Sequence, residues 1–124
     1  MTIQEALQRA DRQQPNQIDL REKLRWLSQL DQMAWREVYS THRDPDHPEF
    51  PGYNDATSQD TPLLIDGPDA EDIYKYWLWW HIDEQTGELE KYNADVVRFN
   101  SAWQTWADWY NKTHKPTTRA RIKW

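Results

Sequence analysis

The most regular pattern of apolar positions lies near the C-terminal end of the chain. Apolar or aromatic residues recur there at alternating spacings of three and four, at Leu89, Tyr92, Val96, Phe99, Trp103, Trp106 and Tyr110. This spacing places them on one face of an α-helix over three heptads. Leaving that face in water would forgo about 1.5–3 kcal/mol per large side chain, so it should pack against other helices. The pattern is typical of a helical packing protein and indicates no enzyme.

Two further helices are predicted in the N-terminal third. Residues 3–13 follow a capping box formed by Thr2 and Glu5, which marks a helix start. A longer amphipathic helix is predicted over residues 19–40, where apolar residues again recur at helical spacing. Asp31 interrupts its apolar stripe, so we expect this carboxylate at the edge of the buried face.

A fourth helix precedes the aromatic one. Residues 68–84 follow a Gly-Pro-Asp start signal and are apolar nearly all round, which is typical of a central helix or of one shared with a neighbouring subunit. The alternative is one unbroken helix over residues 68–113, about 70 Å long at 1.5 Å per residue. A break at 84–88 is preferred, because Gly87 can end one helix and Thr86 can cap the next, over residues 87–113.

The remaining segments lack helical periodicity. Residues 41–67 contain four prolines and two glycines and predict a long irregular loop, within which residues 62–65 form a short strand or pack on the core. Near the C-terminus apolar and basic residues alternate, which predicts a short strand in need of a partner edge. We therefore expect an all-α fold: a small bundle of three to four helices over residues 1–114 and a basic extended tail over residues 115–124.

Composition supports a folded but interaction-prone protein. The 124 residues suit one domain, and the mean hydropathy of −1.14 is offset by nine Trp, six Tyr and two Phe. This is more aromatic surface than a small core needs, which favours oligomerisation. Cysteine is absent, so disulfide and thiolate chemistry are excluded. Without an apolar run of about 20 residues or a signal-peptide pattern, we expect a soluble, intracellular protein and no membrane partner.

Charge is unevenly distributed along the chain. Residues 111–124 carry five basic and no acidic side chains, whereas the rest carries 10 basic and 21 acidic ones, which gives +5 and −11. Unlike patches of this kind suit self-association, and the acidic body disfavours duplex nucleic acid. A solvated acidic surface with a frayed basic end is the alternative interpretation.

Candidate chemistry is sparse. His42 and His47 lie with three carboxylates in one short Pro-containing stretch, and all these groups could bind a divalent metal, but their spacing matches no established ligand motif. A polar surface loop is the favoured interpretation. His81 lies in an aromatic helix beside acids but without a nucleophile motif, which favours a satisfied interfacial histidine. We expect no catalytic residue, cofactor or metal.

The aromatic residues divide into a core and an interface. We expect burial, within or between subunits, of Trp77, Trp80, Val96, Phe99, Trp103 and Trp106. Trp79 and Trp109 fall off the main stripes and are candidates for facing a partner subunit. In the tail, the interface candidates are Arg119, Arg121, Ile122, Lys123 and Trp124, which would dock on an acidic neighbour.

Several segments together resemble a known group of proteins. They are Asp60-Thr61-Pro62-Leu63-Leu64-Ile65, Tyr76-Trp77-Leu78 with Ile82-Asp83, Gly87-Glu88 with Lys91-Tyr92-Asn93, Phe99-Asn100-Ser101-Ala102, and Tyr110-Asn111-Lys112-Thr113-His114-Lys115-Pro116. The chain resembles small proteins encoded among the head and tail genes of prophages and tailed phages of Gram-positive bacteria, although its helices are richer in Trp. That group is similar to head–tail connector adaptors, which form a ring beneath the portal through a helical bundle and extended arms. None of the shared motifs is catalytic.

The resemblance implies a virion structural protein, present in the host cytoplasm during assembly, whose partners are its own copies and other head or tail proteins such as a portal. Sequence-specific nucleic-acid binding is not expected. One alternative is a small acidic phage protein that inhibits a host nucleic-acid enzyme by presenting carboxylates as phosphate mimics. Another is a metal-dependent enzyme that uses His42, His47 and neighbouring acids.

Overall fold

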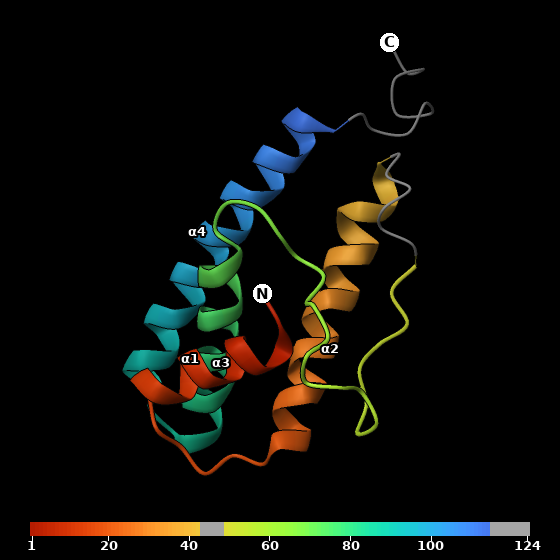
Figure 1. Cartoon of the computed structure of the whole chain (residues 1–124). Coiled ribbons are helices and arrows are strands. Elements are labelled where there is room, and N and C mark those ends of the chain that lie inside the picture. The colour runs from red at the N-terminus through yellow and green to blue at the C-terminus, as the bar shows by residue number, and fades with distance from the viewer. Residues whose placement is uncertain (43–48, 115–124) are drawn as a thin grey trace.

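The computed structural model describes residues 1–42 and 49–114 as an all-α protein (Figure 1). Four α-helices and one 3₁₀ turn follow one another as α1 (Ile3–Gln13), α2 (Leu20–Glu37), η1 (Tyr39–Thr41), α3 (Ala70–Thr86) and α4 (Leu89–Thr113). No strand is present in this part of the chain, where pairing of β type is limited to an isolated bridge between Thr2 and Pro62. The predicted helical bundle is confirmed, whereas the predicted strand in the tail lies outside the described residues.

The helices α3 and α4 form an antiparallel hairpin with the most extensive helix–helix contact in the fold (Figure 1). Gly87 ends α3 with a left-handed backbone (φ 80°), so the predicted break is confirmed. The expected cap is wrong, because Thr86 is still part of α3 and its hydroxyl donates to the Ile82 carbonyl. Glu88 instead occupies the N-cap of α4, without a side-chain hydrogen bond to the helix.

The N-terminus is fixed by both its own cap and the irregular segment. Thr2 and Glu5 form the predicted capping box at the start of α1. The backbone of the first residues then pairs with residues 59–63, through Ile3 N–H to the Thr61 carbonyl (3.0 Å) and Leu63 N–H to the Met1 carbonyl (2.8 Å). This pairing carries the chain around residue 62 onto the core, which is one of the two predicted outcomes for residues 62–65.

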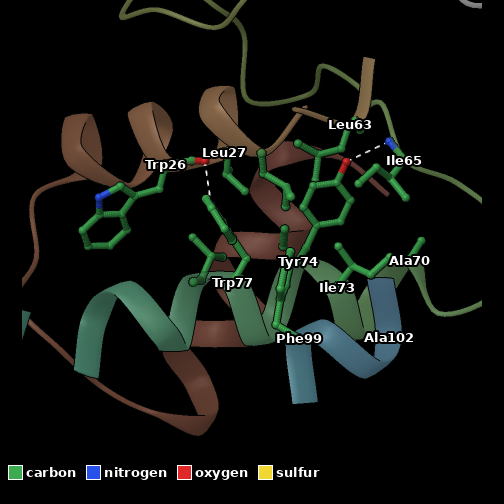
Figure 2. Close-up of a cluster of buried hydrophobic side chains, with 14 of the residues drawn as sticks. Trp26, Leu27, Leu63, Ile65, Ala70, Ile73, Tyr74, Trp77, Phe99 and Ala102 are labelled. Carbon is green, nitrogen blue, oxygen red and sulfur yellow. Dashed lines mark hydrogen bonds between the residues drawn. The ribbon is translucent and has the colours of Figure 1, made fainter. Parts of the chain in front are cut away.

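The core is built around α3, against which α1, α2 and α4 pack (Figure 2). The Trp77 indole N–H donates to the Trp26 carbonyl of α2 (2.8 Å), and the Trp106 indole N–H donates to the Asp66 carbonyl (3.0 Å). Buried tryptophans need such partners, because an unpaired N–H in an apolar interior costs free energy. These two bonds orient large rings from α3 and α4 toward other segments of the chain.

The buried face of α4 is rotated relative to the predicted one. Its buried residues are Asp95, Phe99, Ala102, Trp106, Ala107 and Tyr110. Of the six expected core residues, Trp77, Phe99 and Trp106 are buried, whereas Trp80, Val96 and Trp103 are only half-buried. Leu89 is 68% exposed. The predicted stripe therefore combines residues that are buried in the α3–α4 interface with residues that lie beside this interface and are partly open to solvent.

Asp31 is at the centre of the fold and not at an edge, so this expectation is wrong. Its side chain is fully buried and accepts hydrogen bonds from Tyr53 Oη (2.5 Å), Tyr74 Oη (2.6 Å) and the Leu64 backbone N–H (3.0 Å). Burial raises the pKa of this carboxyl to about 6, although the three hydrogen bonds act in the opposite direction. The carboxylate joins α2, α3 and the irregular segment, whose donors it satisfies.

Candidate interaction surface

Four half-buried side chains lie along one flank of the α3–α4 hairpin, namely Trp80, Tyr92, Val96 and Trp103, and are called the aromatic ridge. Trp80 lies 6.2 Å from Tyr92, measured between ring centroids. Trp80 and Trp103 both contact the buried ring of Phe99, at 5.6 and 5.9 Å. Phe99 therefore supports the two tryptophans, and part of each side chain of the ridge is open to solvent.

His81 stacks on Trp80, one residue of the ridge. His81 lies between Trp26 and Trp80, at centroid distances of 5.2 and 5.4 Å, with both pairs of rings stacked. Burial, together with the charge of Arg25, lowers the pKa of His81 to about 4. Its Nε2 atom is buried without a hydrogen-bond partner in the part of the chain that the structure describes. His81 is therefore a neutral structural ring at pH 7, and its polar atoms are less well satisfied than the sequence suggested.

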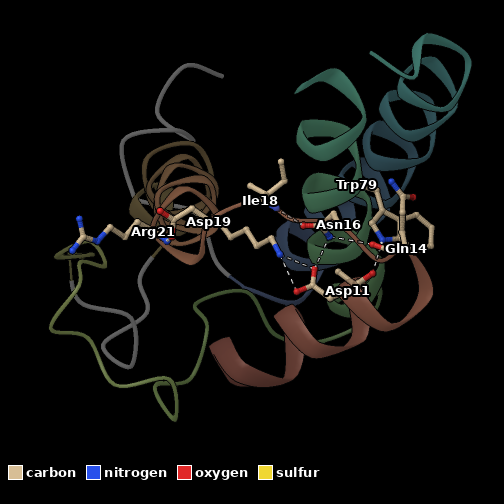
Figure 3. A network of polar contacts seen from close by, with 9 residues as sticks. Asp11, Gln14, Asn16, Ile18, Asp19, Arg21 and Trp79 are labelled. Atoms are coloured by element: carbon tan, nitrogen blue, oxygen red, sulfur yellow. Dashed lines mark hydrogen bonds and ion pairs between the residues drawn. The ribbon is translucent and has the colours of Figure 1, made fainter. Parts of the chain in front are cut away.

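The two tryptophans expected to face a partner are each engaged within their own chain. The Trp79 indole N–H donates to the Ala10 carbonyl at the end of α1 (3.2 Å; Figure 3), and the Lys75 ammonium lies 5.3 Å from the Trp79 ring centroid. Trp109 packs over Gly67 in the segment that leads into α3. Both rings are half-buried, so only their remaining surface is available to a partner.

The other predicted interface residues lie outside the described part of the chain. These are the tail residues Arg119, Arg121, Ile122, Lys123 and Trp124. His47 also lies outside it. His42 is described, and its placement corrects the expectation of a polar surface loop.

The His42 imidazole is buried where the ends of η1 and α4 meet. Its Nδ1 atom lies 2.7 Å from the Val38 carbonyl, and its ring contacts Tyr110 edge-on at 4.8 Å. His114 repeats this local arrangement at the end of α4, with Nδ1 3.2 Å from the Tyr110 carbonyl. In both places a Thr-His pair ends a helical segment, and the His42 and His114 rings lie 6.5 Å apart. A structural role at the helix ends accounts for His42.

An acidic segment extends through the irregular region and the start of α3. Residues 49–74 contain seven acidic side chains and neither Lys nor Arg. This concentration of acidic side chains was not predicted, although the run without a basic residue is visible in the sequence. Its charge is opposite in sign to that of residues 111–124.

Neither a group of metal-ligating side chains nor a membrane-spanning helix is found among the described residues. Within residues 1–42 and 49–114, no three His, Asp or Glu side chains gather as a metal site would require. No helix in the same ranges is both long and apolar enough to cross a bilayer.

Fold and surface together define an all-α bundle with an aromatic ridge. No protein-family model, curated protein or solved structure gave a match to this chain.

Proposed function

We propose that this protein is a non-catalytic assembly subunit, specifically a head–tail connector (adaptor) of a tailed phage that forms a ring with its own copies. The partners in this proposal are neighbouring copies and other head or tail proteins such as a portal. The setting is the virion, and the host cytoplasm during assembly. The supporting observation is the aromatic ridge, because several large rings are held half-exposed along one rigid helix hairpin.

The ridge has the composition of a subunit interface. Aromatic side chains are enriched in interface cores, where a ring can bury 150–250 Å². At about 25 cal/mol per Å², completing the burial of several half-exposed rings contributes a favourable association energy. A second copy that covers Tyr92 and Trp103 would also cover the exposed Leu89 at the start of α4. In a ring, each subunit can pack its α3–α4 hairpin against the hairpin of the next copy, so that the same contact is repeated around the ring.

The opposite charges supply the second contact. In the proposed ring, the basic tail of one subunit lies on the acidic segment of the next, residues 49–74. Each subunit then offers one arm and one receiving face, which is a head-to-tail arrangement that closes a ring when the rotation permits. The specific connector role comes from the resemblance of the sequence to phage head and tail proteins.

The test is the mass of the purified protein across a range of concentrations, measured by size-exclusion chromatography with light scattering. We expect the wild type to form a defined oligomer, seen as rings by negative-stain electron microscopy. Trp103→Glu places a charge on the ridge and should shift the protein toward monomer. Ser101→Glu adds the same charge at an exposed position of α4 and should leave assembly unchanged. A wild-type monomer at all concentrations would contradict the proposal.

The concentration of carboxylates in residues 49–74 favours one second candidate, a protein that mimics nucleic-acid phosphates and inhibits a host enzyme. Such a protein would be a monomer or dimer and would bind a basic host protein. The same mass measurement separates the two functions, because only the connector requires a closed ring.

A further inference from the structure

Two buried carboxyl groups face each other across the α3–α4 hairpin. Asp83, near the end of α3, is 1% exposed, and Asp95, in α4, is 3% exposed. Asp83 acts on Asp95 through a side-chain hydrogen bond and through its charge. The Oδ2 atom of each residue is buried without a hydrogen-bond partner among the described residues. A hydrogen bond between two carboxyl groups requires a proton on one of them, because two carboxylates offer only acceptors.

The neighbouring groups do not neutralise this pair. Gln14, at the end of α1, donates its amide N–H to Asp83 Oδ1 (2.5 Å) but brings no charge. Lys91 and Arg98, both on α4, favour ionisation of Asp95, but their effect is smaller than those of burial and of Asp83. From α3, the charged group that faces Asp95 is Asp83 itself. Glu88 and Lys91 line the adjoining cavity of about 420 Å³ together with Asp83.

We propose that Asp83 and Asp95 share one proton across the α3–α4 interface, and that this proton stabilises the packing of the hairpin. Loss of the proton places two negative charges side by side in a water-poor site, which repel each other. The Glu88 backbone N–H donates to the Asp83 carbonyl (2.9 Å), so the pair lies next to the turn that joins the two helices. The inference does not depend on the proposed assembly function.

The pKa of Asp95 determines the pH range over which the shared proton is lost. Burial, followed by the hydrogen bond and charge of Asp83, raises the pKa of Asp95 to about 7 from an ordinary value of 3.8. The folded protein then holds a proton that the unfolded chain has already lost, so this site makes stability fall as pH rises between about 4 and 7. Above that range the ionised pair exerts its full destabilising effect.

The decisive variant is Asp95→Asn, which keeps the size of the side chain and supplies a permanent N–H donor to Asp83. Between pH 5 and 7, we expect the wild-type folding equilibrium constant to fall by up to about tenfold per pH unit relative to the variant, as one proton requires. Urea denaturation at several pH values measures this. Asp108→Asn, at an exposed position of α4 bonded to Gln104, is the control and should follow the wild type.

A second readout follows the proton in the native wild type. Carbon-13 NMR of the Asp carboxyl carbons should show one member of the pair titrating near neutral pH, and infrared spectroscopy should show a protonated carboxyl band that Asp95→Asn removes. The difference spectrum separates this band from any contribution of Asp31. Parallel pH profiles for the wild type and Asp95→Asn would overturn the proposal, as would titration of both carboxyls below pH 5.

Discussion

The Trp109 ring lies directly over Gly67, so closely that a Cβ atom at residue 67 would be 2.6 Å from Trp109 Cζ3. The contact joins the second half of α4 to the segment that leads into α3. Gly67 also has φ 93°, a backbone conformation that other residues rarely adopt. Two independent requirements, one steric and one conformational, therefore select glycine at this position.

Gly67→Ala should destabilise the fold by about 2–4 kcal/mol, as the sum of backbone strain and displacement of the Trp109 ring. Gly87 provides the matched control, because its φ is also positive (80°) but its Cβ would meet nothing within 4 Å. Gly87→Ala should cost only the strain, about 1 kcal/mol. Chemical denaturation of both variants measures the difference, and equal losses would show that the Trp109 contact contributes nothing.

Phe99→Ala should cost about 3–5 kcal/mol, because Phe99 is buried and supports both Trp77 and the aromatic ridge. This is enough to unfold a marginal small domain. Leu89→Ala, at an exposed position of the same helix, should change the stability of the monomer little. Thermal denaturation followed by circular dichroism compares the two variants. A Phe99→Ala protein with unchanged thermal stability would mean that the buried face of α4 is assigned incorrectly.

Tyr74→Phe should destabilise the protein by about 1–3 kcal/mol. The Tyr74 hydroxyl donates to Asp31 Oδ1 and accepts the Ile65 backbone N–H (2.8 Å), so its removal takes this partner from both groups. Asp31 keeps the hydrogen bonds that Tyr53 and Leu64 donate to its Oδ2 atom. Tyr92→Phe removes a hydroxyl from the half-buried ridge and should have a smaller effect. Urea denaturation at pH 7 measures the stability of both variants. A Tyr74→Phe protein as stable as the wild type would show that the Tyr74 hydrogen bonds do not stabilise the fold.

His81 should make the fold sensitive to acid. Its pKa is lowered to about 4 in the folded protein, below its ordinary value of 6.5, so the unfolded state binds the proton more readily. The contribution of His81 to stability is therefore complete above about pH 6.5 and is lost as pH falls toward 4. His81→Phe should lose less stability than the wild type over this range in pH-dependent denaturation. Identical slopes would show that His81 does not titrate differently on folding.

Deletion of residues 116–124 tests the tail as the linking arm. We expect the helical circular dichroism of the shortened protein to stay nearly unchanged, while higher-order association is lost. Association of the full chain should weaken at high salt, because exposed charges are screened beyond about 8 Å at physiological ionic strength. A shortened protein that assembles normally at both low and high salt would contradict this role for the tail while leaving the ridge to be tested by itself.

The helices and their ends were largely predictable, because the signals that set them are local. The capping box of Thr2 and Glu5 and the glycine at residue 87 act within one turn of the helix that they begin or end. The spacing of aromatic residues from Tyr92 to Tyr110 likewise reports a helical repeat without reference to any partner. The all-α class followed from these features alone.

The candidate surface was only partly predictable, because the sequence does not state how α4 is rotated against α3. Phe99 and Trp103 belong to the same predicted stripe, yet one is buried and the other lies on the ridge. The separation depends on where α3 crosses α4, which is decided by the packing of both helices.

The sequence by itself determined which residues form helices, where those helices break, and that aromatic surface exceeds the needs of a small core. Tertiary structure alone decided that Asp31 and His42 are buried and that Asp83 faces Asp95. The physical reason is that burial depends on segments that are distant in the sequence, which bring polar partners to a carboxylate such as Asp31 or cover an imidazole such as His42 with the Tyr110 ring. Asp31 obtains its partners from Tyr53, Leu64 and Tyr74, which lie 22 to 43 residues further along the chain.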